Sequence, residues 1–265
     1  MAVLGKGSAH GACSLLHAAA LGYGANIALD LSITVRLLDR PSKREVVDDD
    51  GVLQALMAAW TGAGHPLPEG FELDELHWGV VSKIPKAQGL KSSAAMCIAA
   101  LRALCNATET ELTPEAMVAL AADAQTNAGV SLTGSIDDAW ACMTPGWKLV
   151  DVQAPIEEGV LMDEPGLPED EWVVLLVLRG PREVRPTLED FASQVTASTG
   201  PRRPAGPKST GGVDVERSWD RCCSAGHRGS KNDQRFLHEQ RQSRRHHRVR
   251  ACLGDRGTSK RKTDH

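Results

Sequence analysis

The sequence lacks the long apolar runs and paired cysteine motifs that mark membrane proteins and disulfide-rich proteins. No stretch approaches the roughly 18 uninterrupted apolar residues of a membrane helix, and residues 1–12 hold one lysine and no long apolar run. We therefore expect neither an export signal nor a membrane span. The seven cysteines include no Cys-x-x-Cys spacing and the nine histidines show no metal-ligand spacing, which argues against a disulfide framework or a zinc site. A reducing cytoplasm fits this composition best.

Aliphatic residues become scarce after about Phe191, and basic residues take their place. Residues 201–265 carry 17 Lys and Arg against 7 Asp and Glu, although the whole chain has a formal net charge of -4. Such a segment buries too little apolar surface to offset the entropy cost of ordering it. We predict that residues 194–265 form a basic tail that is disordered, or that arises from a frameshift or a fusion.

The first 190 residues show the alternating and helical periodicities of a folded protein. Apolar and polar residues alternate from Asn26 to Leu37, which predicts a long half-buried strand. The stretch from Ala94 to Cys105 is apolar nearly all round, which predicts a buried helix. Further elements are predicted by the same reasoning, namely a helix after the acidic turn 48–50, a strand at 76–84, a helix at 113–124 and a strand at 172–178. Strands and helices packed in layers predict an α+β fold.

The most informative segment, residues 84–95, joins a predicted strand to the buried helix. The unpaired N–H groups and the positive dipole end of a helix N-terminus can hold a phosphate group. Gly89 lets the backbone approach the phosphates, and Lys91 adds a positive charge. Ser92 and Ser93 can cap the helix, and one of their hydroxyls can reach a magnesium ion on a nucleotide. An ordinary serine-capped helix after a glycine turn is the alternative.

The string Pro-x-x-x-Gly-Leu-x-Ser-Ser-Ala-Ala at residues 85–95 resembles the phosphate-binding motif of the GHMP kinases. A Walker A loop and the glycine loop of protein kinases are both absent. Lys91 replaces the glycine of most GHMP members, and Gly-Leu-Lys-Ser-Ser resembles the archaeal shikimate kinases. Residues 14–31 resemble the N-terminal strand and glycine loop of that family, and residues 133–139 resemble its Thr-Gly-x-x-Asp-Asp-Ala segment. The resemblance covers roughly residues 5–190.

The resemblance implies ATP and Mg²⁺ as cofactors and assigns residues to bind them. The expected ATP-binding residues form one continuous loop, which consists of Pro85, Lys86, Ala87, Gln88, Gly89, Leu90, Lys91, Ser92, Ser93, Ala94 and Ala95. Ser93 and Asp123 are the expected ligands of Mg²⁺, an ion that prefers carboxylate and phosphate oxygens.

The resemblance also implies a site for a small-molecule substrate near the glycine loop. The expected substrate-binding residues are His17, Gly22, Gly24 and Asp30. Four positions depart from the family pattern. His17, Leu21 and Tyr23 stand where the family leads us to expect asparagine, threonine and lysine, and Ala94 replaces a third serine.

Two adjacent acidic residues, Asp137 and Asp138, are the candidate catalytic groups. Phosphoryl transfer needs in-line geometry, neutralisation of developing charge and a group that accepts the proton of the attacking hydroxyl. The spacing to Gly146 makes Asp138 our first choice for this base. Adjacent carboxylates in a strand or turn point in different directions, so the other carboxylate is expected to serve structure or metal binding. A solvated turn is the alternative for either residue.

The resemblance further implies a two-domain α+β GHMP fold, whose N-terminal domain is like ribosomal protein S5 domain 2. We expect the ATP-binding domain at residues 1–150 and the start of the C-terminal domain at residues 151–193. This second domain is expected to be incomplete, because no second glycine-rich loop follows residue 190.

The implied activity is that of a shikimate kinase, which transfers the γ-phosphate of ATP to the 3-hydroxyl of shikimate in chorismate and aromatic amino-acid biosynthesis. One alternative is another GHMP kinase with homoserine or mevalonate as acceptor. Another is an inactive truncated kinase whose basic tail binds nucleic acid without sequence specificity. Shikimate is the expected partner, and neither a specific nucleic acid nor a membrane is expected.

Overall fold

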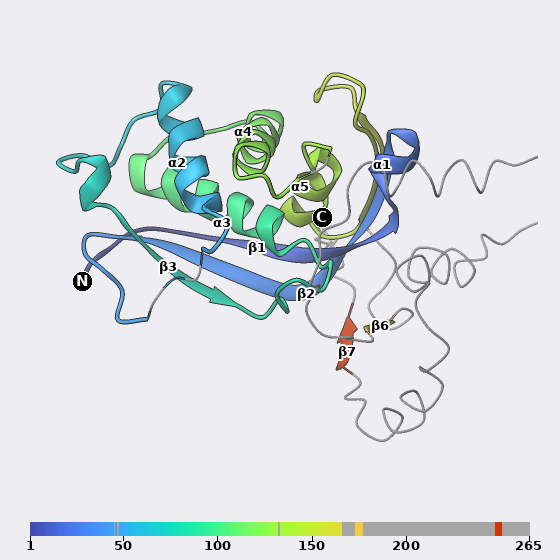
Figure 1. Ribbon diagram of the computed structural model, residues 1–265, viewed down its shortest axis with the longest axis horizontal. Coiled ribbons are helices and arrows are strands. Elements are labelled where there is room, and N and C mark those ends of the chain that lie inside the picture. Colours follow the sequence, from blue (N-terminus) through green and yellow to red (C-terminus); the bar gives the residue numbers. More distant parts are fainter. Residues whose placement is uncertain (45, 47, 132, 166–172, 177–246, 251–265) are drawn as a thin grey trace, which may run out of the picture.

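The computed structural model describes residues 1–44, 46, 48–131, 133–165, 173–176 and 247–250. Most of them form a five-stranded sheet with helices on one of its faces (Figure 1). The strands are β1 (Val3–Leu16), β2 (Tyr23–Leu38), β3 (His77–Ser82), β4 (Trp147–Asp151) and β5 (Val160–Glu164). The helices are α1 (Ala18–Leu21), α2 (Val52–Gly62), α3 (Ser92–Thr108), α4 (Pro114–Asn127) and α5 (Ile136–Met143), with a 3₁₀ turn at Leu73–Glu75. The predicted α+β fold is confirmed.

The long strand β2 organises the sheet, in which all pairs of neighbouring strands are antiparallel. One edge of β2 pairs with β1 along most of its length. On the other edge, residues 33–38 pair with β3 and residues 23–27 pair with β4, which in turn pairs with β5. The segment between β3 and β4 contains α3, α4 and α5. The chain therefore leaves the sheet after β3, forms these three helices and returns to the same edge of β2 as β4.

Helix α3 packs closely on the sheet because small residues line both sides of the contact. A Cβ atom added to Gly5 or Gly7 of β1 would collide with the backbone oxygens of Ala103 and Ala99 of α3. The fully buried alanines of this helix are Ala94, Ala95, Ala99, Ala100 and Ala103. Close packing of this kind buries apolar surface without a cavity, and it confirms the prediction of a buried helix.

The ends of α2 and α4 follow from short polar residues in the sequence. Asp48 accepts hydrogen bonds from the backbone nitrogens of Val52 and Leu53, each at 2.9 Å. Thr113 accepts one from the backbone nitrogen of Ala116 at 3.2 Å. Side-chain oxygens thus satisfy N–H groups that a helix start leaves unpaired, and both predicted helix starts are confirmed.

The remaining described residues bear on the predicted C-terminal part. β6 (Val173–Leu176) pairs with β7 (His247–Arg250) in a separate two-stranded sheet. The four residues of β7 therefore differ from the structureless tail that we predicted, while the rest of residues 194–265 lies outside the described residues. β5 belongs to the main sheet although it lies beyond residue 150, where we expected the first domain to end. The division into domains stays a prediction. No helix in the described part is both long and apolar enough to span a bilayer.

Candidate active site

The predicted phosphate loop joins β3 to α3 and turns sharply. Ala87, Gly89 and Lys91 have left-handed backbone, with φ of 54°, 74° and 59°, a conformation that only glycine adopts freely. The prediction that Ser92 or Ser93 caps α3 is wrong, because Lys91 occupies the N-cap position and no side chain accepts a hydrogen bond there. The two serines are instead the first residues of the helix. The start of α3 therefore lacks a side-chain cap for its N–H groups.

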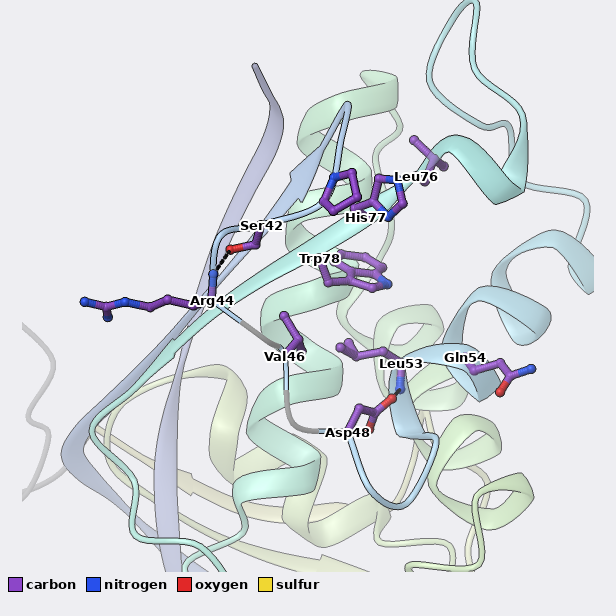
Figure 2. Close-up of a pocket in the computed structure, with 10 residues that line it drawn as sticks. Ser42, Arg44, Val46, Asp48, Leu53, Gln54, Leu76, His77 and Trp78 are labelled. Atoms are coloured by element: carbon purple, nitrogen blue, oxygen red, sulfur yellow. Dashed lines mark hydrogen bonds between the residues drawn. The ribbon is translucent and has the colours of Figure 1, made fainter. Parts of the chain in front are cut away.

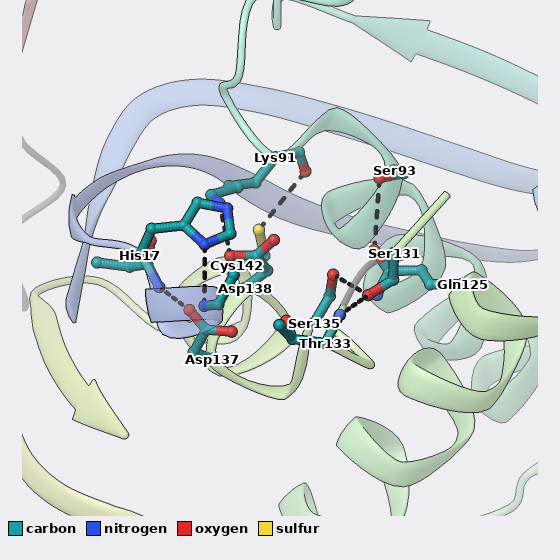
Figure 3. A network of polar contacts seen from close by, with 12 residues as sticks. His17, Lys91, Ser93, Gln125, Ser131, Thr133, Ser135, Asp137, Asp138 and Cys142 are labelled. Atoms are coloured by element: carbon teal, nitrogen blue, oxygen red, sulfur yellow. Dashed lines mark hydrogen bonds and ion pairs between the residues drawn. The ribbon is translucent and has the colours of Figure 1, made fainter. Parts of the chain in front are cut away.

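The two lysines of this loop have different surroundings. The side chain of Lys91 is 12% exposed, and its Nζ lies 2.7 Å from Oδ1 of Asp138 on α5 (Figure 3). The side chain of Lys86 is 64% exposed, and its Nζ lies 3.9 Å from Oδ2 of Asp49 in the turn before α2. The expectation that Lys91 adds charge for a phosphate was incomplete, because the ammonium also binds a carboxylate of the protein.

The acidic pair lies in the first turn of α5, which corrects our expectation of a strand or turn. Ser135 forms the N-cap with φ of 53° and donates its hydroxyl to Ser131 at 2.8 Å. Asp137 is buried and accepts a hydrogen bond from Nδ2 of Asn26 on β2 at 2.9 Å. Asp138 points to Lys91 instead. Consecutive residues of a helix face different directions, so one carboxylate is held by the sheet and the other by the phosphate loop.

The surroundings of the two carboxylates shift the pKa values of nearby groups. Burial, with a smaller contribution from the charge of Asp138, raises the pKa of Asp137 to about 6, although Lys91 and Asn26 oppose this shift. Burial alone would lower the pKa of Lys91, but the charge and hydrogen bond of Asp138, together with Asp137, raise it above its ordinary value. Lys91 therefore carries a positive charge in the folded protein, and Asp137 gains a proton more readily than an ordinary aspartate.

The two glycines predicted to bind substrate make room for side chains of the protein itself. A Cβ atom on Gly24 would collide with Oδ2 of Asp137, and one on Gly22 would lie 2.7 Å from Nε2 of Gln153. Gly22 also has φ of 78° and ends α1. Gly24 is thus required for the position of Asp137, whether or not it also touches a substrate.

The two other predicted substrate residues lie on either side of this glycine loop. His17 is the N-cap of α1, and its Nδ1 accepts a hydrogen bond from the backbone nitrogen of Ala19 at 3.1 Å. Figure 3 shows its ring in the same close-up as Lys91 and the acidic pair. Asp30 is exposed on β2. Burial and the charge of Arg102 lower the pKa of His10, and the charge of Asp30 partly offsets this shift.

Ser93 contacts a residue of α4 that is not the predicted metal ligand. Its Oγ donates a hydrogen bond to Oε1 of Gln125 at 3.4 Å, and Gln125 is buried. Asp123 is exposed, because residues two apart in a helix point to different sides. Ser93 and Gln125 thus bring two side-chain oxygens together at the start of α3. Among the described residues, no group of three or more His, Cys, Asp and Glu side chains could hold a metal ion.

A cavity of about 440 Å³ lies between the chain after β2, the start of α2 and the start of β3 (Figure 2). Its lining includes the indole of Trp78, the ring of His77 and the carboxylate of Asp48. Asp49, the residue after Asp48, is the partner of Lys86 in the phosphate loop. The turn that lines the cavity is therefore in contact with the loop.

The residues that build this arrangement match a known family of kinases. Residues 51–146, which contain the phosphate loop and the acidic pair, match the family described as GHMP kinases N terminal domain. These residues are therefore similar to the N-terminal domain of the GHMP kinases. The chain is similar in sequence to the shikimate kinase of Methanocella arvoryzae, with 32% identity over 153 residues, 55% of this chain and 49% of the relative. The shikimate kinase of Methanothrix thermoacetophila is 32% identical over 150 residues, 56% of this chain and 50% of the relative.

The fold of the chain also agrees with a solved structure. The mevalonate kinase of Methanococcus jannaschii superposes with a TM-score of 0.61, over 93% of this chain and 98% of that chain, at 13% identity. At this identity the match shows the fold alone, and the predicted GHMP fold is confirmed. The chain spans about half the length of the curated relatives that it matches.

Within the matched residues 51–146, the structure brings Lys91 of the phosphate loop together with Asp137 and Asp138. It does not bring Asp123 or Asp30 into this set of contacts. The roles of all these residues stay predictions.

Sequence reasoning missed Asn26 and Gln125. The pairing of β1 with β2 shifts register between His10 and Ala12. Along β2, the buried positions change there from even numbers, among them Asn26, to odd numbers. Simple alternation therefore could not show that Asn26 faces α5. Gln125 looks like an ordinary helix residue, and only the packing of α4 on α3 reveals its contact.

Proposed function

We propose that this protein is an ATP-dependent kinase that phosphorylates a small alcohol, and that its acceptor is shikimate. The observation that carries the proposal is the ion pair of 2.7 Å between Lys91 and Asp138. It joins a helix start suited to phosphate groups to a carboxylate suited to proton transfer. A kinase needs these two functions side by side, because the phosphoryl donor and the attacking hydroxyl must meet in line.

In this proposal Asp138 is the general base and Asp137 has a structural role. Asp138 is partly exposed, with 16% of its side chain accessible, so it can reach a bound hydroxyl. Asp137 is only 4% exposed and accepts a hydrogen bond from Asn26. A base must be within hydrogen-bond reach of the proton that it takes, and Asp138 meets this condition better.

The reaction itself is a single displacement at phosphorus. The Asp138 carboxylate accepts the proton of the 3-hydroxyl of shikimate as that oxygen forms a bond to the γ-phosphorus of ATP. The bond between the γ-phosphorus and the β,γ-bridging oxygen breaks, and ADP leaves with its electron pair. The N–H groups at the start of α3 and the ammonium of Lys91 offset the negative charge that surrounds the reacting phosphorus.

The nucleotide in this proposal enters as its magnesium complex. The hydroxyl of Ser93 at the start of α3 is an oxygen donor of the kind that holds Mg²⁺ beside a nucleotide, so this residue fits the ion. The buried Gln125 accepts a hydrogen bond from this hydroxyl at 3.4 Å. When bound, Mg²⁺ would neutralise the phosphate oxygens. Asp123, which we expected as a ligand, is exposed and is supported less well by its position.

Shikimate is favoured as the acceptor by the relatives that carry that name. Two shikimate kinases are 32% identical to this chain, over 153 and 150 residues. The departures at His17, Leu21 and Tyr23 lie next to the glycine loop and bear on the acceptor more than on the nucleotide. Homoserine and mevalonate are therefore the competing acceptors to test.

The test is a coupled assay of ADP release from MgATP by the full chain, with shikimate, homoserine and mevalonate offered in parallel. We expect turnover with shikimate alone. A preference for another acceptor would contradict the substrate assignment but retain the kinase. A lack of turnover with all three, together with binding of a fluorescent ATP analogue, would indicate a nucleotide-binding protein that has lost catalysis.

A further inference from the structure

The side chain of Lys91 is committed to Asp138 in the absence of any ligand. Its ammonium and the carboxylate lie 2.7 Å apart, and the two side chains are 12% and 16% exposed. Charges with so little access to water are costly to leave unpaired. If Lys91 turned away to serve only as a phosphate ligand, Asp138 would remain as an uncompensated carboxylate beside Asp137.

The backbone of Lys91 is also fixed between two helices. Its φ of 59° lies in the left-handed region, which residues with a side chain rarely adopt. Its carbonyl oxygen accepts the backbone N–H of Ala95 at 2.9 Å and a contact from Sγ of Cys142 on α5 at 3.8 Å. Lys91 therefore spans from the first turn of α3 to α5 through both its backbone and its side chain (Figure 3).

Two carboxylates in one helical turn create an electrostatic problem for a kinase. Asp137 and Asp138 would repel the phosphates of an incoming nucleotide, and the repulsion would be strong because water has little access to the site. The described residues place one ammonium, that of Lys91, in contact with this pair. An ammonium has three N–H donors, so Lys91 can bind Asp138 and still offer a donor to a phosphoryl oxygen.

We propose that Lys91 is the positioning residue of Asp138. The ammonium of Lys91 orients the carboxylate of Asp138 and separates its charge from that of the nucleotide. This inference rests on the proposed function, since it takes Asp138 as the base. It goes beyond a phosphate-binding role for Lys91, because it predicts an effect on the chemical step larger than the effect on nucleotide binding.

The experiment compares Lys91→Met and Lys91→Arg in the full chain, with Lys83→Met as the matched control. Lys83 is exposed at the end of β3, and its replacement removes the same charge two residues before the loop. The readouts are kcat, KM for ATP and the Kd of a fluorescent ATP analogue. We expect Lys91→Met to lower kcat on the order of 100-fold and to weaken the Kd by a smaller factor, about tenfold or less. Lys91→Arg should recover a large part of kcat, and Lys83→Met should leave both quantities within about twofold.

A Kd weakened tenfold or more in Lys91→Met, with kcat preserved at saturating ATP, would overturn the proposal and leave Lys91 as a phosphate ligand only. If the unmodified protein shows no turnover, the proposed function fails, and thermal unfolding then tests the pairing alone. Lys91→Met and Asp138→Asn should each lower the unfolding midpoint, and the double variant should lose less than the sum. Additive losses would overturn the pairing as well.

Discussion

The helix starts of α3 and α5 share a backbone conformation and differ in charge. Each has a residue with a side chain in left-handed conformation at the N-cap, Lys91 with φ of 59° and Ser135 with φ of 53°, and neither has a side-chain cap. The first turn of α3 contains no acidic residue, whereas that of α5 contains Asp137 and Asp138. Since a helix start favours negative charge, α5 supplies its own anions and α3 leaves that place for a ligand.

This difference in charge suits the two helix starts to different roles. The α3 start is suited to bind a phosphate group, and the α5 start presents carboxylates that can accept a proton. Lys91 belongs to the first and contacts the second. The predictions below alter one helix start at a time, so that binding and chemistry can be separated.

The largest effect is expected from Asp138→Asn at the α5 start. The amide keeps the size of the side chain but cannot accept the proton of the acceptor hydroxyl, so kcat should fall by about 10²- to 10⁴-fold. The Kd of a fluorescent ATP analogue should change little, because the α3 start is intact. Steady-state kinetics and a binding titration measure the two quantities. A variant with unchanged kcat would remove Asp138 from the mechanism.

The next effect is expected from Gly24→Ala, which acts on the α5 start through the sheet. The new Cβ would collide with Oδ2 of Asp137, and overpacking of this kind costs about 1–3 kcal/mol of unfolding free energy. Urea unfolding measures this loss. Gly62→Ala in α2 is the matched control, since an added Cβ there meets nothing within 4 Å. The account is contradicted if both variants are equally stable.

A pH-dependent effect is expected from Asp137→Asn. Because burial raises the pKa of Asp137 to about 6, the folded state binds more protons than the unfolded state between about pH 4 and pH 6. The contribution of Asp137 to stability therefore falls as the pH rises through this window. The variant should be more stable than the unmodified protein at pH 8, by about 3 kcal/mol, and the difference should vanish near pH 4.

Urea unfolding at pH 4.5 and pH 8 measures this difference. Asp74→Asn, at an exposed position, is the control and should not show it. An equal effect of Asp137→Asn at both pH values would mean that the buried carboxylate stays ionised throughout.

The smallest effect is expected from Lys86→Met at the α3 side. The exposed ion pair of Lys86 with Asp49 contributes little to stability, at most about 1 kcal/mol. The loss of positive charge near the phosphates should weaken binding of the ATP analogue by a few-fold, and the loss should shrink at high salt. Binding titrations at two salt concentrations test this. A large drop in kcat would contradict the separation between the two lysines.

Local sequence patterns predicted the parts of the molecule that depend on neighbouring residues. The alternation after Asn26, the alanines from Ala94 and the capping residues Asp48 and Thr113 all led to elements that the structure contains. The loop at residues 84–95 was recognised because its residue types and their order are specific.

Contacts between distant segments could not be predicted in the same way. Whether Lys91 reaches a phosphate or Asp138 depends on how α5 packs beside α3, which is not encoded in either segment alone. The register shift in the pairing of β1 with β2 turned Asn26 toward Asp137. The serine caps were wrong because Lys91 adopts a left-handed conformation that the sequence pattern disfavours.

The central claim is that Lys91 and Asp138 act as one unit in the chemical step, and a double-mutant cycle in kcat tests it most directly. The cycle compares Lys91→Met, Asp138→Asn and the double variant with the unmodified protein at saturating ATP and shikimate. When two residues act as a unit, replacing the second causes little further loss of kcat once the first has been replaced. We therefore predict that the double variant is about as slow as Asp138→Asn alone. Losses that multiply would contradict the claim, because they would mean that the two residues contribute independently.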